Sequence, residues 1–121
     1  MPTASGHTTA IRAKKVIGTA VKDPSGNKIG EIEDVVLDKT SNNIMFAAVS
    51  FGGFLGMNEK YHPIPWNLLK YAADESGYVV DLTKEQLQSA PADSISELTK
   101  NDGLSYRDRA FDYYRSPRYW E

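Results

Sequence analysis

His62 is the side chain of this sequence best suited to exchange a proton near neutral pH. An unperturbed imidazole titrates at about pH 6.5, and the other histidine, His7, lies in a small polar stretch at the amino end. No serine or carboxylate stands beside His62 in a recognisable triad motif. We therefore expect no catalytic residue and interpret His62 as an exposed or barrel-edge histidine.

A glycine-rich segment precedes this histidine. The run Gly52-Gly53-Phe54-Leu55-Gly56 contains glycines that permit backbone angles closed to other residues. Such a loop could hold a phosphate, but it lacks the G-x-x-x-x-G-K-[ST] pattern and no helix signal follows it. We predict a structural turn and interpret Trp66 as a core or corner anchor. A small-ligand site formed by this loop with His62 and Trp66 is an alternative, and no cofactor is expected.

An acidic run raises the question of a metal site. Its members are Glu31, Glu33, Asp34 and Asp38. Their spacing does not match an EF-hand loop, and alternate residues of a strand point the same way, which favours a solvated face. The chain has no cysteine, which excludes thiolate metal sites and disulfides. We predict no metal site.

Aromatic and arginine side chains alternate near the carboxyl end. Six of the 13 aromatic residues lie in the last 16 positions. Rings interleaved with arginines can stack on nucleic-acid bases, but they are also typical of protein contacts. Neighbouring acidic residues offset most of the charge, which favours packing against the barrel or a partner. The predicted contact residues are Tyr106, Phe111, Tyr113, Tyr114, Tyr119 and Trp120.

The chain as a whole offers little attraction for phosphate or anionic lipid. Its 121 residues include 14 Lys and Arg against 16 Asp and Glu, a formal net charge of −2, so nucleic acid is not an expected partner. The longest uncharged apolar stretch, Ile44 to Met57, has 14 residues, fewer than the roughly 20 that a membrane helix needs. Without a secretory signal pattern, we expect one cytoplasmic domain and no membrane span.

Short β-rich runs separated by turns predict about six strands. Asp23-Pro24-Ser25-Gly26 has the residue preferences of a type I turn and should join the first two strands as a hairpin. Prolines 63 and 65 cannot donate to a ladder on both sides, so their strand should lie at a sheet edge. The predicted strands are Val16–Lys22, Lys28–Asp38, Ile44–Phe51, Lys60–Pro65, Lys70–Ala73 and Tyr78–Leu82.

Two of these strands have irregular apolar patterns. In a regular strand, Ile32 would point to one face of the sheet and both Val35 and Leu37 to the other. A bulge near Glu33–Asp34 would bring all three side chains inside. Ile44–Phe51 has apolar side chains on both parities, so both of its faces must be covered. One face can fill a barrel, whereas the other needs a lid from this chain or from a second copy. The strand residues predicted for such an interface are Met45, Val49 and Phe51.

Helical signals follow the strands. Thr83 and Gln86 fit a capping box, and Ser94 with Glu97 repeats its signature. A third helix is predicted over Tyr106–Arg115 with Ser105 as its cap. Its predicted buried face comprises Tyr106, Ala110, Tyr113 and Tyr114.

Four segments taken together resemble the PRC-barrel family. Their order and spacing within Val16 to Ala90 are more specific than any one of them. The ending Asp112–Trp120 is similar to the tail of stand-alone bacterial members, although Arg115 and Arg118 stand where Gly and Pro are expected. The four segments are Lys28–Asp38, Val49–Gly56, Pro63–Trp66 and Asp81–Leu87.

The resemblance implies a mainly β fold, a small open β-barrel of about six strands with short C-terminal helices. Such barrels are known from the cytoplasmic part of the photosynthetic reaction centre H subunit and from the C-terminal domain of a bacterial ribosome-maturation factor. Neither role transfers directly, because the first uses a membrane helix and the second a partner domain. The resemblance therefore implies a docking module and not an enzyme.

The expected organisation is a flexible tail at 1–14, a barrel at 15–90 and a helical aromatic extension at 91–121. Our leading hypothesis is a non-enzymatic protein-interaction module that self-associates as a homodimer through barrel and extension. A second hypothesis is binding of RNA or a ribosomal protein through the arginine and tyrosine side chains. Small-ligand binding is the third.

Overall fold

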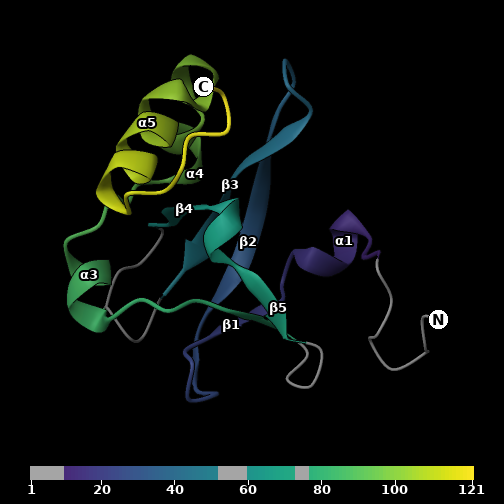
Figure 1. The fold of residues 1–121 in the computed structure, drawn as a ribbon, viewed down its shortest axis with the longest axis vertical. Coiled ribbons are helices and arrows are strands. Elements are labelled where there is room, and N and C mark those ends of the chain that lie inside the picture. The colour runs from purple at the N-terminus through teal and green to yellow at the C-terminus, as the bar shows by residue number, and fades with distance from the viewer. Residues whose placement is uncertain (1–9, 52–59, 73–76) are drawn as a thin grey trace.

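A computed structural model describes residues 10–51, 60–72 and 77–121, which form a curved six-stranded sheet with helices packed on it (Figure 1). The strand order is β4-β3-β2-β1-β6-β5, and the sheet is open, with β4 and β5 as its edges. Neighbouring strands are antiparallel except β1 and β6, which are parallel. This confirms the predicted fold class. The strands are β1 Ala20–Lys22, β2 Lys28–Asp38, β3 Asn43–Ser50, β4 His62–Pro65, β5 Lys70–Ala72 and β6 Gly77–Val79.

The predicted turn joins β1 to β2. The Gly26 amide donates to the Asp23 carbonyl at 2.9 Å, and the Asp23 carboxylate accepts from the amides of Ser25 and Asn27. The first strand is shorter than predicted, because residues 13–16 form helix α1, Ala13–Val16. Gly18 then adopts a φ of +89°, a left-handed backbone angle that separates α1 from the start of β1.

Two bulges shape the long pairing of β2 with β3. The register skips Glu33 in β2, so the predicted bulge is confirmed and Val35 packs against the same core as Ile32. A second shift skips Met45 in β3. Leu37 was expected inside, but it is 64% exposed. The reason is that the end of this hairpin extends beyond the enclosed core (Figure 1).

Strand β3 is buried on both faces, as the sequence required. One face contributes Ala47 and Val49 to the core enclosed by the sheet, and Phe51, directly after the strand, joins the same core. The other forms a second core with Leu98 and contributes Met45, Phe46 and Ala48. Strict alternation along the strand would place Met45 on the same face as Val49. That placement is wrong, because the bulge at Met45 turns its side chain toward the second core. The lid comes from the same chain, since Leu98 and the adjoining Tyr106 lie in the C-terminal helices.

These helices begin as the capping signals indicate, with one exception. They are α3 Lys84–Gln88, α4 Ile95–Leu98, η3 Lys100–Gly103 and α5 Leu104–Tyr113. The Thr83 hydroxyl accepts from the Gln86 amide at 3.1 Å, and the Gln86 side chain accepts from the Thr83 amide at 2.8 Å. The Ser94 hydroxyl caps α4. Ser105 is not a cap, because α5 starts directly after Gly103, whose left-handed backbone ends η3.

We predict that Gly30→Ala lowers the free energy of unfolding by about 2–3 kcal/mol. A Cβ at Gly30 would lie 2.1 Å from the carbonyl oxygen of Ser50, so the backbone of β3 would have to move. Urea unfolding measures the change. The neighbouring Glu31→Ala is the control, because the Glu31 side chain is 44% exposed and its ion pair with Lys28 contributes less than about 1 kcal/mol. Equal losses in both variants would contradict the steric account.

Candidate functional site

His62 lies inside the protein. The residue is 1% exposed, and its ring meets Phe51 edge-on with 5.2 Å between centroids. Within the described residues neither ring nitrogen makes a hydrogen bond of good geometry, although the Pro91 backbone is close enough to interact with the ring. Burial lowers the pKa of His62 to about 4, and the Pro91 backbone only partly offsets this. Strand β4 is an edge strand, so the barrel-edge alternative for His62 fits, whereas the exposed alternative is wrong because the surrounding side chains exclude water.

Trp66 opens the short turn η1, Trp66–Leu68, between β4 and β5. Its ring centroid lies 5.4 Å from that of Tyr78, and both rings pack at the enclosed core. Trp66 is therefore a corner anchor. The glycine-rich run at 52–56 lies outside the described residues, so a ligand site shared by that run, His62 and Trp66 stays a prediction.

The C-terminal aromatic residues pack on their own chain. The segment after α5 turns back along that helix (Figure 1), and the rings of Phe111 and Trp120 meet with 4.9 Å between centroids. The Arg107 guanidinium lies 3.7 Å from the centre of the Trp120 ring, a cation–π geometry. Tyr106 donates to the Asp93 carboxylate at 2.6 Å. These contacts lie within the extension and join its tail and Asp93 to α5.

The buried face of α5 differs from the predicted one. Ala110 and Phe111 are buried, whereas Tyr113 is 37% exposed and donates to a backbone carbonyl of α3, that of Gln86. Phe111 is buried because the returning tail covers it. Tyr114 packs against the enclosed core with its hydroxyl buried, and this burial raises the pKa of Tyr114.

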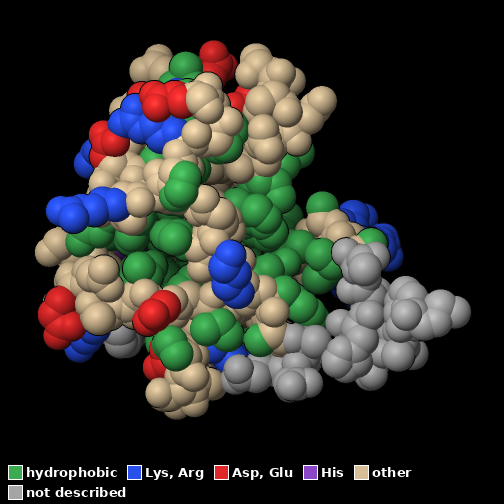
Figure 2. Space-filling view, in the orientation of Figure 1, with side chains coloured by type: hydrophobic (Ala, Val, Ile, Leu, Met, Phe, Trp, Pro, Cys, Tyr) green, Lys and Arg blue, Asp and Glu red, His purple; other side chains and the backbone are tan. Residues whose placement is uncertain are grey.

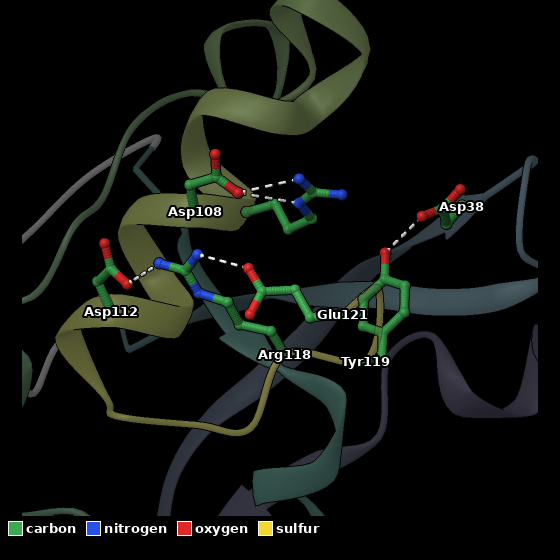
Figure 3. A network of polar contacts seen from close by, with 7 residues as sticks. Asp38, Asp108, Asp112, Arg118, Tyr119 and Glu121 are labelled. Atoms are coloured by element: carbon green, nitrogen blue, oxygen red, sulfur yellow. Dashed lines mark hydrogen bonds and ion pairs between the residues drawn. The ribbon is translucent and has the colours of Figure 1, made fainter.

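Asp38 joins the end of β2 to the tail. The Tyr119 hydroxyl donates to its carboxylate at 2.6 Å (Figure 3), and the Thr40 hydroxyl donates at 2.7 Å. These bonds lower the pKa of Asp38, the one from Tyr119 most. Burial, followed by the bond to Asp38, raises the pKa of Tyr119 to about 12. The solvated position predicted for Asp38 is wrong, because the tail and the following turn cover it.

Arginines of the extension are also used within the chain. Arg118 forms ion pairs with Asp112 and Glu121 (Figure 3). The Arg109 guanidinium lies 4.5 Å from the centre of the Tyr106 ring. These contacts leave fewer free cations with which the extension could bind RNA.

The strand residues predicted for an interface are buried in one copy. Met45, Val49 and Phe51 are each at most 2% exposed. A second copy could reach Val49 or Phe51 only by opening the barrel, since both belong to the enclosed core. Met45 differs, because it lines a hollow at the surface.

This hollow, of about 470 Å³, lies between the end of the β2–β3 pair and the start of α5. Leu37 and Leu104 line it and are 64% and 42% exposed. Lys39 and Asp102 line it too, and within the described residues neither has an ion-pair partner. We call it the Leu37–Leu104 hollow.

The rim of the hollow has a strained backbone. Asn101, Asp102 and Gly103 have φ angles of 53°, 60° and 75°, all left-handed, and each non-glycine residue there costs about 1 kcal/mol. A Cβ at Gly103 would lie 3.0 Å from the Met45 sulfur, so the turn packs closely on β3. Sequence reasoning missed the hollow because it placed Leu37 inside.

The described residues contain neither a cluster of metal-ligating side chains nor a membrane-spanning helix. Across 10–51, 60–72 and 77–121, no group of three or more His, Asp or Glu side chains could hold a metal ion. Over the same ranges no helix combines the length and apolar character needed to cross a membrane. In the acidic run, Glu31 pairs with Lys28 at 2.7 Å, and Glu33 accepts from the Ser50 hydroxyl.

We predict that stability falls as the pH drops from about 6.5 toward about 4. The unfolded imidazole binds a proton near pH 6.5, whereas folded His62 resists protonation until about pH 4. The unfolded state therefore binds more protons in this window, and the full effect is about 3 kcal/mol. Urea unfolding across the window should show this slope in the parent and in His7→Gln. His62→Leu should lose it, and an unchanged slope in that variant would contradict the assignment.

We predict that Tyr119→Phe lowers the melting temperature by about 5 °C, because it removes a hydrogen bond to a buried carboxylate. Thermal unfolding followed by circular dichroism measures the shift. Tyr113→Phe is the matched control, since its hydroxyl bonds a neutral carbonyl at the exposed surface. A larger shift in the Tyr113 variant would show that Asp38 does not anchor the tail.

Comparison with known proteins identifies one family. The PRC-barrel domain matches residues 8–87, a range that contains the six strands described above and spans well over half of the chain. PRC-barrel domains are generally non-catalytic. No curated protein matches the chain. The chain belongs to the PRC-barrel domain family.

Proposed function

We propose that this chain is a non-enzymatic protein-interaction module that self-associates through its barrel and its C-terminal extension. The Leu37–Leu104 hollow carries this proposal, because β2 contributes Leu37 and α5 contributes Leu104. Large apolar side chains left exposed around a hollow are typical of protein contact sites.

The shape of the hollow suits a second copy of the chain. Leu37 projects at the rim with 64% of its surface exposed, and the hollow beside it has Met45 at its base. In a two-fold contact the same patch meets itself, so Leu37 of each copy would enter the hollow of the other. A projecting side chain next to a matching cavity provides both halves of such a contact.

The charges at the hollow support the same arrangement. Lys39 and Asp102 have opposite signs and no ion-pair partner in the described part of the chain. A two-fold axis through the hollow would bring Lys39 of one copy toward Asp102 of the other, twice per dimer. Complementary charges at an interface favour this register over others.

We predict that Leu37→Asp converts a dimer to a monomer, with the dissociation constant raised at least about 100-fold. The cause is loss of the inserted side chain and burial of a carboxylate against the apolar side chains of the hollow, Met45 and Leu104. Sedimentation velocity across a concentration series measures the mass. Tyr71→Asp is the matched control, since Tyr71 is 45% exposed on β5 and does not line the hollow. It should leave the mass unchanged.

A charge exchange tests the orientation of the two copies. Lys39→Asp should weaken the dimer about tenfold, because it places like charges together, and Lys39→Asp combined with Asp102→Lys should restore it. A monomeric parent chain at high concentration would overturn self-association. A dimer that Leu37→Asp leaves intact would overturn the use of this hollow.

A further inference from the structure

The charge of this chain is distributed unevenly. The first 22 residues contain four basic and no acidic side chains, whereas the remainder contains ten basic and sixteen acidic ones. The small net charge therefore hides a positive amino-terminal region on an acidic body. A molecule with this asymmetry turns its positive end toward a negatively charged surface.

The basic residues surround α1 together with exposed aliphatic side chains. Arg12, Lys14 and Lys15 are exposed and have no ion-pair partner within the described residues. Ile11 and Ile17, one on each side of them in sequence, are 46% and 45% exposed. Figure 2 shows blue and green side chains side by side over α1, at the right of the molecule. We call these five residues the α1 surface.

We propose that the α1 surface binds the headgroup layer of an anionic lipid bilayer. Val16 is 5% exposed and packs into the enclosed core, so it fixes the helix to the barrel with its polar residues outward. Lysine and arginine can keep their charges at the phosphate level while their methylene stems lie along apolar groups. Ile11 and Ile17 would enter the boundary with the acyl chains.

A bilayer fits this surface better than a nucleic acid does. Surfaces that bind single-stranded nucleic acids combine cations with aromatic rings that stack on bases, and the α1 surface has aliphatic side chains in their place. Arg107, Arg109 and Arg118 of the extension and the rings of its Tyr106, Phe111 and Trp120 are engaged within the chain instead. Binding to a bilayer also requires no shape complementarity. It requires only cations beside apolar side chains that can be buried away from water.

The expected binding is reversible and depends on salt. Each basic residue near an anionic membrane strengthens binding about fivefold, so three of them give about 100-fold. Partial burial of each isoleucine adds about fivefold. The proposal does not depend on self-association, because one copy carries the complete α1 surface.

Co-sedimentation of the full chain with lipid vesicles tests the proposal. The probes are vesicles of phosphatidylcholine with roughly one third phosphatidylglycerol and vesicles of phosphatidylcholine alone. At low ionic strength the chain should sediment with the anionic vesicles and not with the neutral ones, and high salt should release it.

Variants separate the charged and apolar parts of the surface. Lys14→Glu with Lys15→Glu should weaken binding about 25-fold or more, and Lys14→Arg with Lys15→Arg should retain it. Ile11→Ser with Ile17→Ser should weaken it about 25-fold at unchanged charge. The matched control is Lys60→Glu with Lys100→Glu, since both lysines lie near Asp93, away from α1.

Several results would overturn the proposal. They are no binding to anionic vesicles at low salt, equal binding to neutral vesicles, binding that survives the Lys14→Glu, Lys15→Glu change, and binding that the isoleucine changes leave intact. Tighter binding to a single-stranded RNA or to a polyglutamate peptide than to the vesicles would also overturn it. Circular dichroism of each variant confirms that the fold is retained.

Discussion

Burial of β3 on both faces is the constraint on which this structure depends. An open sheet of six short strands encloses one core, so it can cover Val49 and Phe51 but not Phe46 on the opposite side. The remaining face needs apolar partners, which α4 and α5 supply. The C-terminal extension is thus part of the fold, since Tyr106 packs on the second core and Tyr119 bonds Asp38 of β2.

Features formed by interactions between residues close in sequence could be predicted from the sequence. The turn at Asp23 and the capping box at Thr83 satisfy backbone amides two to four positions away, so the residue types alone specify them. The bulge at Glu33 could be predicted because the parity of the apolar residues changes there. The two-sided apolar pattern of β3 likewise required a cover, although not a particular one.

Features that depend on distant partners could not be predicted. Asp38 is covered by Tyr119, 81 positions later, and nothing local distinguishes it from the other carboxylates of β2. His62 loses its ordinary pKa through burial, and one of the rings that covers it, that of Phe51, lies 11 positions earlier, directly after β3. The bulge at Met45 leaves no parity signal, because apolar side chains fill both faces of β3. The hollow combines Leu37 with Leu104, which only the packed extension brings together.

Both proposed contact surfaces lie where the sheet can no longer cover apolar side chains. Strand β2 has 11 residues and β1 has 3, so the far end of β2 has no enclosed core to join and leaves Leu37 in water. Helix α1 precedes the sheet at another end and leaves Ile11 and Ile17 exposed. The charges beside them separate their roles. The hollow has charges of both signs, which suit a protein surface with complementary charges. The α1 surface has cations only, which suit a uniformly anionic surface.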